Sequence, residues 1–222
     1  SLIAALVSNE LKQSNNQIEK LKTFSIGLPG SEDLKYAKIV AEHIDSDHNE
    51  IILSEDDFFN AIPEVINKIE SYDTTTVRAS VGNYLIAKYI KENTDIVVVF
   101  NGDGSDEQSG YKYLRNAPDK KQFHKECLKL LNNINYFDVL RSDRSVSSRW
   151  GLEARTPFLD KEFVEYYMTI DSNLKMYNDK NKLPEKYLLR KAFENLDIIP
   201  KTVLWRPKEA FSDGCSSEDR SW

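Results

Sequence analysis

The chain has 222 residues, of which 40% are hydrophobic and 30% charged, and its formal net charge is −6. This composition is typical of a soluble globular protein of one large or two small domains with a sizeable core. Because no basic block is concentrated anywhere, we expect neither nucleic acid nor an anionic membrane surface as a partner, and an anionic ligand would need a locally positive pocket. No apolar segment is long enough to span a bilayer. The two cysteines, Cys127 and Cys215, lie far apart without metal-ligand spacing, which favours a reducing, cytoplasmic compartment.

Strand and helix patterns alternate in the first half of the chain. Helical spacing of apolar residues predicts a helix over residues 2–11, and a helix with acidic residues in its first turn over residues 31–44. Short apolar runs at residues 23–28 and 50–53 predict strands. The first half is therefore expected to form a layered α/β structure.

Three polar or special residues refine these elements. Ser54 and Asp57 have the spacing of a capping box for the next helix. Pro63 is expected to open a further helix rather than lie inside a long one. His43 and His48 have no third ligand or nucleophile nearby, so surface or structural roles are favoured over catalysis.

Residues 72–80 contain three consecutive threonines followed by Arg78. The threonines can cap a helix that runs to about Lys91. An arginine beside hydroxyl groups would equally suit a carboxylate or a phosphate. Spacing alone leaves both interpretations open.

The chain is organised around residues 96–107, where an unbroken apolar run ends in two glycines and three carboxylates. The run predicts a strand buried on both faces, as in a parallel sheet, with the acids at its carboxyl end. Ligands of open α/β sheets bind at that end. The glycines let backbone N–H groups approach a polyphosphate, and the carboxylates can hold a divalent metal. The alternative is an ordinary acidic, glycine-rich surface turn.

Strand signals stop after this loop, and the remainder of the chain is expected to be helical. Residues 123–131, 161–168 and 185–193 have helical patterns, whereas residues 149–160 and 205–214 are loop-like and rich in charge and aromatic rings. The chain is therefore expected to divide into a nucleotide-binding α/β part, residues 1–110, and a helical part, residues 111–222, around one sheet-centred core.

Five segments together resemble, in order, motifs of the synthetase domain of the glutamine-dependent asparagine synthetases, and the resemblance covers nearly the whole chain. Residues 72–80 resemble the family's substrate loop, and residues 102–107 resemble its Gly-Glu-Gly-Ser-Asp-Glu motif. One short motif is weak evidence, but five in the right order are specific. The segments are residues 25–31 with Asp33, 72–80, 102–107, 151–160 and 205–214.

The resemblance implies the fold of the N-type ATP-pyrophosphatases (adenine nucleotide α-hydrolase-like), with a central parallel sheet. It also implies a carbon–nitrogen ligase of asparagine biosynthesis that uses ATP and Mg²⁺. The β-carboxylate of aspartate would attack the α-phosphorus, giving β-aspartyl-AMP and pyrophosphate, and ammonia would then displace AMP. Aspartate and ammonia, or glutamine as the ammonia source of a glutamine amidotransferase, are the implied small-molecule partners. A homodimer of the full-length protein is left open.

The resemblance also assigns roles to individual residues. The implied catalytic groups are Asp103, which would position the intermediate and handle the proton of ammonia, and Lys208, which would contact the α-phosphate. The implied ligand for Mg²⁺ is Asp106. The implied ATP-binding residues are Ile26, Asn101 and Gly102, and the implied substrate-binding residues are Thr75, Thr76 and Arg78.

Some family features differ or are absent. Asn101 stands where the family has serine, and Asp103 is one methylene shorter than the family's glutamate. The family's Ser-Gly-Gly-Leu-Asp-Ser pyrophosphate loop and its glutaminase domain are expected before Ser1, and its last helix beyond Trp222. The alternatives are thus a non-catalytic truncated fragment and, less favoured, another amide-forming relative such as a β-lactam synthetase.

Overall fold

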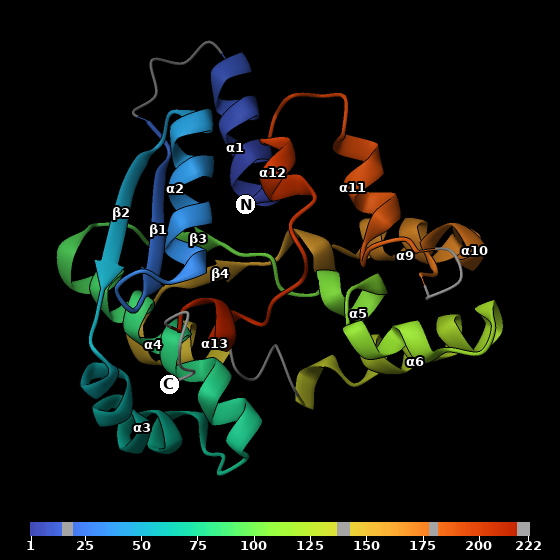
Figure 1. Cartoon of the computed structure of the whole chain (residues 1–222). Helices are drawn as coiled ribbons and strands as arrows, with labels where there is room; N and C mark the ends of the chain where they lie inside the picture. The colour runs from blue at the N-terminus through green and yellow to red at the C-terminus, as the bar shows by residue number, and fades with distance from the viewer. Residues whose placement is uncertain (15–19, 137–142, 178–181, 217–222) are drawn as a thin grey trace.

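The computed structural model describes residues 1–14, 20–136, 143–177 and 182–216. Among them, two pairs of parallel strands form two small sheets (Figure 1). Strand β1 (Lys22–Gly27) pairs with β2 (Asp47–Ile52), with Ile26 opposite Ile51. Strand β3 (Val98–Phe100) pairs with β4 (Glu153–Arg155), with Val99 opposite Ala154. The chain is thus α/β with parallel strands, but the predicted single central sheet is not formed by the described residues.

Helices surround the strands and make up most of the second half. In Figure 1, α1 and α2 lie beside β1 and β2, while α6, α9, α10 and α11 gather on the other side of the molecule. None of the described helices is long and apolar enough to cross a membrane. The α-helices are α1 (Leu2–Gln13), α2 (Glu32–Ile44), α3 (Glu55–Ile69), α4 (Thr74–Asn93), α5 (Ser105–Ser109), α6 (Lys120–Asn132), α8 (Ser148–Trp150), α9 (Lys161–Thr169), α10 (Ser172–Lys175), α11 (Tyr187–Phe193), α12 (Lys201–Leu204) and α13 (Phe211–Gly214). Shorter helical turns are η1 (Lys112–Asn116), η2 (Ile134–Tyr136), η3 (Asp143–Ser147) and η4 (Pro157–Leu159).

Helix α3 confirms one local prediction and overturns another. Ser54 accepts the Asp57 backbone N–H at 3.3 Å, and the Asp57 carboxylate accepts the Ser54 backbone N–H at 2.8 Å, which is the predicted capping box. The prediction that Pro63 opens a new helix is wrong, because α3 continues through it. An interior proline costs about 3 kcal/mol. The buried face on both sides of it, which includes Phe58 and Val65, outweighs this cost, since each fully buried large apolar side chain contributes about 1.5–3 kcal/mol.

Strand β3 departs from its prediction in burial. Its existence is confirmed, but Val98 is 42% exposed and Phe100 53% exposed, so the strand is not buried on both faces. Val99 alone of the three packs against buried residues, in a cluster with Ala87 and Leu152. The strand pairs with β4 within the described part of the chain, and this pairing leaves apolar side chains facing solvent.

Strand β4 was not expected, because residues 149–160 were predicted to be a loop and strand signals were predicted to stop after the acidic loop. Its residues, Glu153, Ala154 and Arg155, have low strand propensity, so no local pattern marks them. Pairing with β3 imposes the extended conformation. The Glu153 backbone N–H donates to the Val97 carbonyl at 2.7 Å, and the Asn101 N–H donates to the Arg155 carbonyl at 3.0 Å.

The main core lies between β1, α3 and α4. It contains Ile26 and Cys215, two residues that are nearly 190 positions apart, together with the buried faces of both helices. Both cysteines are buried and are not joined in a disulfide. Burial raises the pKa of Cys127 to about 12, so this thiol stays protonated. Because Cys215 packs against β1, the last described residues of the chain lie at the carboxyl end of this strand.

The exposed apolar residues of β3 predict self-association of the 222-residue chain, because an open strand edge with apolar side chains invites pairing between molecules. We expect Val98→Lys to raise the protein concentration at which light scattering begins. Leu196→Lys, at a residue with similar exposure outside the strands, is the matched control and should have little effect. Equal improvement by both variants would mean that general charge, not β3, controls solubility.

Candidate active site

The loop that follows β3 is held by its own polar groups. Asn101 Nδ2 donates to Asp103 Oδ2 at 2.9 Å, and the Asp103 backbone N–H donates to Asn101 Oδ1 at 3.1 Å. Ser105 Oγ donates to the Gly102 carbonyl at 3.1 Å. Asn and Asp side chains commonly fix turns in this way. The result is a tight turn that leads directly into α5.

Two glycines make room around α5. Gly104 has a φ of 89°, and a Cβ there would lie 2.3 Å from the side chain of Leu159. A Cβ on Gly110 would lie 2.2 Å from Asp106 Oδ1 and 2.4 Å from Lys186 Cε. Only glycine avoids these clashes. Gly110 therefore permits the close approach of Asp106 and Lys186.

Asp106 lies between two lysines from remote segments. Its Oδ1 is 3.0 Å from Lys186 Nζ, and its Oδ2 is 3.3 Å from Lys208 Nζ. Lys186 also donates to Ser105 Oγ at 2.9 Å, and Lys208 donates to the Glu209 carbonyl at 2.9 Å. The three charged side chains are each less than one quarter exposed. They form the charged centre of the candidate site.

The two lysines determine the ionisation of Asp106. Burial acts to raise the pKa of this carboxyl, but the charges and hydrogen bonds of Lys186 and Lys208 outweigh burial and lower it. Burial lowers the pKa of Lys186, and attraction to Asp106 offsets part of that effect. With two cations around one carboxylate, the centre has a surplus of positive charge.

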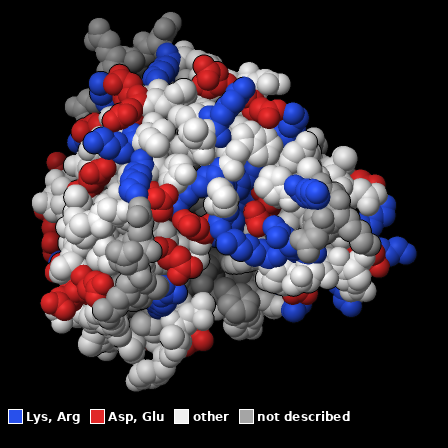
Figure 2. All heavy atoms as spheres, in the orientation of Figure 1, with Lys and Arg blue, Asp and Glu red and all other residues white. Residues whose placement is uncertain are grey.

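The local positive charge at Lys186 and Lys208 contrasts with the negative net charge of the chain. The formal net charge is −6, yet Lys and Arg atoms gather near the middle of the face shown in Figure 2. Phosphate and carboxylate groups bind where ammonium and guanidinium groups converge. An anionic ligand needs such local positive charge in this acidic chain, and Lys186 and Lys208 supply it around Asp106.

The first turns of α4 place the predicted substrate-binding residues near the loop that carries Lys208. Asp73 Oδ2 accepts both the backbone N–H and the hydroxyl of Thr76, each at 2.7 Å, so Thr76 takes part in the helix cap. Thr75 is exposed. Arg78 Nη2 is paired with Asp213 Oδ1 at 2.8 Å. The cap of α4 is thus Asp73 rather than one of the threonines, and Arg78 pairs with a carboxylate of the chain itself, so ligand binding by Arg78 stays a prediction.

The structure brings some predicted site residues together and keeps others apart. Lys208 meets Asp106, Asn101 meets Asp103, and Arg78 contacts the segment that follows Lys208. Ile26 is buried, with its side chain packed in the core, so this side chain is not available to a ligand. The predicted residues thus come from both parts of the chain, although they do not all touch.

Lys186 was missed by the sequence analysis. It lies at the start of a predicted helix, and a lysine there is usually solvated. In the structure its φ is 58°, its backbone N–H donates to the Ser109 carbonyl at 3.2 Å, and its ammonium points to Asp106. No local signal marks such a lysine, because its partner is 80 residues earlier.

The described residues contain no group of three or more His, Cys, Asp or Glu side chains placed to hold a metal ion. This does not exclude Mg²⁺, which usually keeps several waters and takes one or two carboxylates plus substrate phosphates. Asp106 is a suitable oxygen donor. Glu107, the next residue, is buried with Oε2 unpartnered by hydrogen bonds among the described residues, while its Oε1 accepts from Tyr111 at 2.6 Å. These carboxylates suit a hard cation that is bound together with a polyphosphate.

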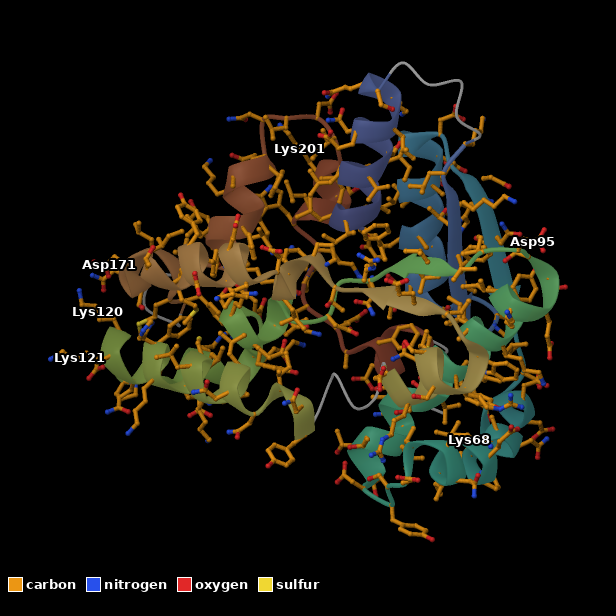
Figure 3. All side chains as sticks on the ribbon, turned by 180° about the vertical axis from the view of Figure 1, so that it is seen from behind. Lys68, Asp95, Lys120, Lys121, Asp171 and Lys201 are labelled. Carbon is orange, nitrogen blue, oxygen red and sulfur yellow. The ribbon has the colours of Figure 1, made fainter. Side chains whose placement is uncertain are left out.

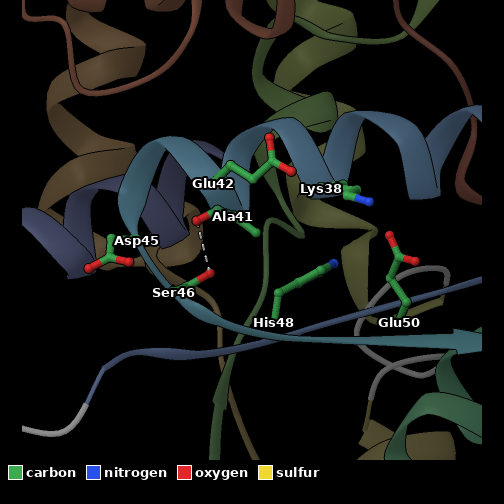
Figure 4. A pocket seen from close by; sticks show the side chains of 7 residues that line it. All are labelled: Lys38, Ala41, Glu42, Asp45, Ser46, His48 and Glu50. Carbon is green, nitrogen blue, oxygen red and sulfur yellow. Dashed lines mark hydrogen bonds between the residues drawn. The ribbon is translucent and has the colours of Figure 1, made fainter.

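A separate cavity of about 430 Å³ lies between α2 and β2 (Figure 4). It is lined by side chains of both charges and by His48. The two ring nitrogens of His48 are bonded to Thr23 Oγ1 at 2.9 Å and Ser25 Oγ at 3.1 Å, so the histidine joins β2 to β1, and burial lowers its pKa. This supports the structural role expected for His48. None of the predicted site residues lines the cavity.

Comparison with known proteins gives a consistent result. The asparagine synthase family model matches residues 1–122 and 108–221. The chain is 47% identical over 223 residues to the glutamine-hydrolyzing asparagine synthetase of Gallus gallus and 48% identical to that of Homo sapiens. The corresponding protein of Mus musculus is 47% identical. Each match covers 100% of this chain but 39% of the relative, so the chain spans about two fifths of the length of these proteins.

The packing of Gly110 gives a stability prediction. Gly110→Ala should lower the free energy of unfolding by about 1–3 kcal/mol, because the new methyl group must displace Asp106 and Lys186. Gly102→Ala is the matched control, since a Cβ there meets nothing within 4 Å. Chemical denaturation of both variants gives the comparison. Similar midpoints for the two would show that the contact around Asp106 is loose.

Proposed function

The chain belongs to the asparagine synthase family, and from that premise we propose that the complete protein makes asparagine from aspartate, ATP and ammonia released from glutamine. The observation that carries the proposal is the Asp106 carboxylate held between Lys186 and Lys208. This centre has the charge needed to hold a polyphosphate, and it follows a strand end, where α/β proteins bind ligands.

The proposed chemistry has two steps. A β-carboxylate oxygen of aspartate attacks the α-phosphorus of ATP, and the bond to the pyrophosphate oxygen breaks, giving β-aspartyl-AMP. Ammonia then attacks the acyl carbon and loses a proton, and AMP leaves with the electron pair of the acyl–oxygen bond. Two anions must meet in the first step, so cations have to cover the phosphates and stabilise the charge that develops.

Lys208 is proposed to stabilise the α-phosphate as the phosphorus becomes five-coordinate. Its ammonium is 3.3 Å from Asp106 Oδ2, and the side chain is mostly buried. A short rotation of a flexible lysine side chain would transfer this ammonium to a phosphate oxygen. Such an interaction is strongest in the transition state, so it acts mainly on the rate rather than on ground-state binding.

Asp106 is proposed to bind Mg²⁺ together with the pyrophosphate oxygens. The bound ion would neutralise phosphate charge and favour departure of pyrophosphate. When Lys208 turns to the phosphate, Asp106 Oδ2 loses its partner and becomes available as an oxygen ligand. Lys186 would stay paired with Asp106 Oδ1 and would still donate to Ser105 Oγ.

The remaining roles follow from the positions of the side chains. Asp103, oriented by Asn101, is proposed to position the intermediate and take the proton from ammonia. The backbone of Ile26, with Asn101 and Gly102, is proposed to contact the nucleotide. Arg78, together with Thr75 and Thr76, is proposed to bind the aspartate substrate or the intermediate.

At the level of the whole molecule, we propose that both strand pairs belong to the parallel sheet of an N-type ATP-pyrophosphatase fold. Residues 1–110 would form its nucleotide-binding part, and residues 111–222 its helical part. We also propose a cytoplasmic location, with which two buried cysteines that are not joined in a disulfide accord. A homodimer is a further proposal that needs a measurement of mass in solution.

Lys208→Met in the complete protein should lower kcat for pyrophosphate release by at least about a hundredfold, as expected when a preorganised donor facing developing charge is lost. The apparent affinity for ATP should change much less. Lys120→Met is the control, because Lys120 forms an exposed ion pair with Asp171 at the far end of the molecule (Figure 3). A loss confined to ATP affinity would limit Lys208 to ground-state binding.

Asp106→Asn in the complete protein should abolish aspartate-dependent pyrophosphate release, because the amide keeps the shape but loses the charge that binds Mg²⁺. Asp171→Asn, in the exposed pair shown in Figure 3, is the control for loss of a carboxylate. The assay measures release with aspartate, ammonium and increasing Mg²⁺. Near-normal turnover would remove Asp106 from the metal site.

A further inference from the structure

Residues 205–215 form the loop that carries Lys208. Both ends of this loop lie next to the side chain of Asp33. Asp33 Oδ1 is 2.7 Å from Arg206 Nη1 at the first end. At the second end, a Cβ on Gly214 would lie 2.5 Å from the Asp33 carboxylate, so only a glycine leaves room for the carboxylate there. The next residue, Cys215, accepts the Leu28 backbone N–H at 2.8 Å. The loop is therefore closed against the start of α2.

Arg206 is fixed from three directions. Its guanidinium donates to Asp33, pairs with Glu209 and lies over the ring of Tyr36, 4.2 Å from the ring centroid. A planar guanidinium suits such combined pairing and stacking, whereas a lysine would keep only the charge. The Arg206 side chain is mostly buried. These contacts hold the backbone two residues before Lys208.

We propose that Asp33 and Arg206 form a clamp that positions Lys208 on Asp106, which makes both of them positioning residues for the reaction proposed above. This inference rests on the proposed function of Lys208. Lysine is a long, flexible side chain, so the direction of its ammonium depends on where its backbone is held. A displacement of about 1 Å in a positioned group can cost about a hundredfold in rate.

The geometry of the loop explains why the clamp acts on Lys208 in particular. Lys208 lies between Arg206 and Glu209, which are both parts of the Arg206 contact network. Its ammonium is 3.3 Å from Asp106 Oδ2, on α5. The other ion pair of this segment, Arg78 with Asp213, is more exposed and holds a position five residues beyond Lys208. Release of Arg206 would thus free the Lys208 backbone, whereas release of Arg78 would not.

Another arginine provides a matched control. Arg149 lies 4.2 Å from the ring centroid of Trp150 and pairs with Glu64 at 3.4 Å, so it has the same kinds of contact as Arg206. It is not part of the loop that carries Lys208. Arg149→Met therefore measures the general cost of losing a stacked, paired arginine.

The kinetic test uses the complete protein and its pyrophosphate release. Arg206→Met should lower kcat by about ten- to a hundredfold with little change in KM for ATP, Arg206→Lys should be intermediate, and Arg149→Met should stay near wild type. In a Lys208→Met background, Arg206→Met should add no further loss, because Arg206 acts through Lys208. The proposal would be overturned if the kcat loss of the double variant equalled the product of the losses of the two single variants. Equal effects of Arg206→Met and Arg149→Met would overturn it as well.

A second measurement does not depend on the reaction. In the ligand-free protein, Asp33→Asn and Arg206→Lys should increase amide hydrogen exchange several-fold across residues 205–215, with little change in α3 and α4. Unchanged exchange in the loop would refute the clamp even if both variants lost activity. Faster exchange in the loop, with no pyrophosphate released by the wild-type protein, would support the clamp and count against the proposed function instead.

Discussion

The candidate site depends on one buried carboxylate with two cationic partners. Asp106 is supplied by the turn after β3, Lys186 by the start of α11, and Lys208 by the loop before α13. An ionised carboxylate at this depth would be costly without partners, and two lysines at this distance would repel each other without it. Both lysines therefore stabilise the carboxylate, and the carboxylate offsets the repulsion between them. Because Asp106 lies in the first part of the chain and both lysines lie in the second, the site requires the two parts to pack together.

Glycine, rather than charge, sets how closely these groups approach. Gly110 leaves space where a single methyl group would meet both Asp106 and Lys186, and Gly104 lets the chain turn into α5 under Leu159. Neither position binds a ligand through a side chain. They matter because the backbone at these two positions lies very close to neighbouring side chains, and a Cβ on any other residue type would clash with them.

Local chemistry was predictable from the sequence, and long-range placement was not. The capping box at Ser54 lies within four consecutive residues, so its pattern was sufficient. Pro63 was misassigned because the packing of α3 outweighs a local propensity, and β4 was missed because only its partner strand makes it extended. In the site, Asp106 and Lys208 were identified by resemblance. Lys186 could not be, since nothing in its neighbours indicates burial.

The bond between Asp33 and Arg206 joins residues 173 positions apart in the sequence. At a synthesis rate of about 5–20 residues per second, Arg206 is made roughly 9–35 s after Asp33. During that interval α2 and β1 can form, but the carboxylate at the start of α2 has no guanidinium to meet. The loop that carries Lys208 can therefore close only when nearly all of this chain has been made. A nascent chain interrupted before this loop would keep the strands and the acidic turn but could not bring the ammonium of Lys208 to Asp106.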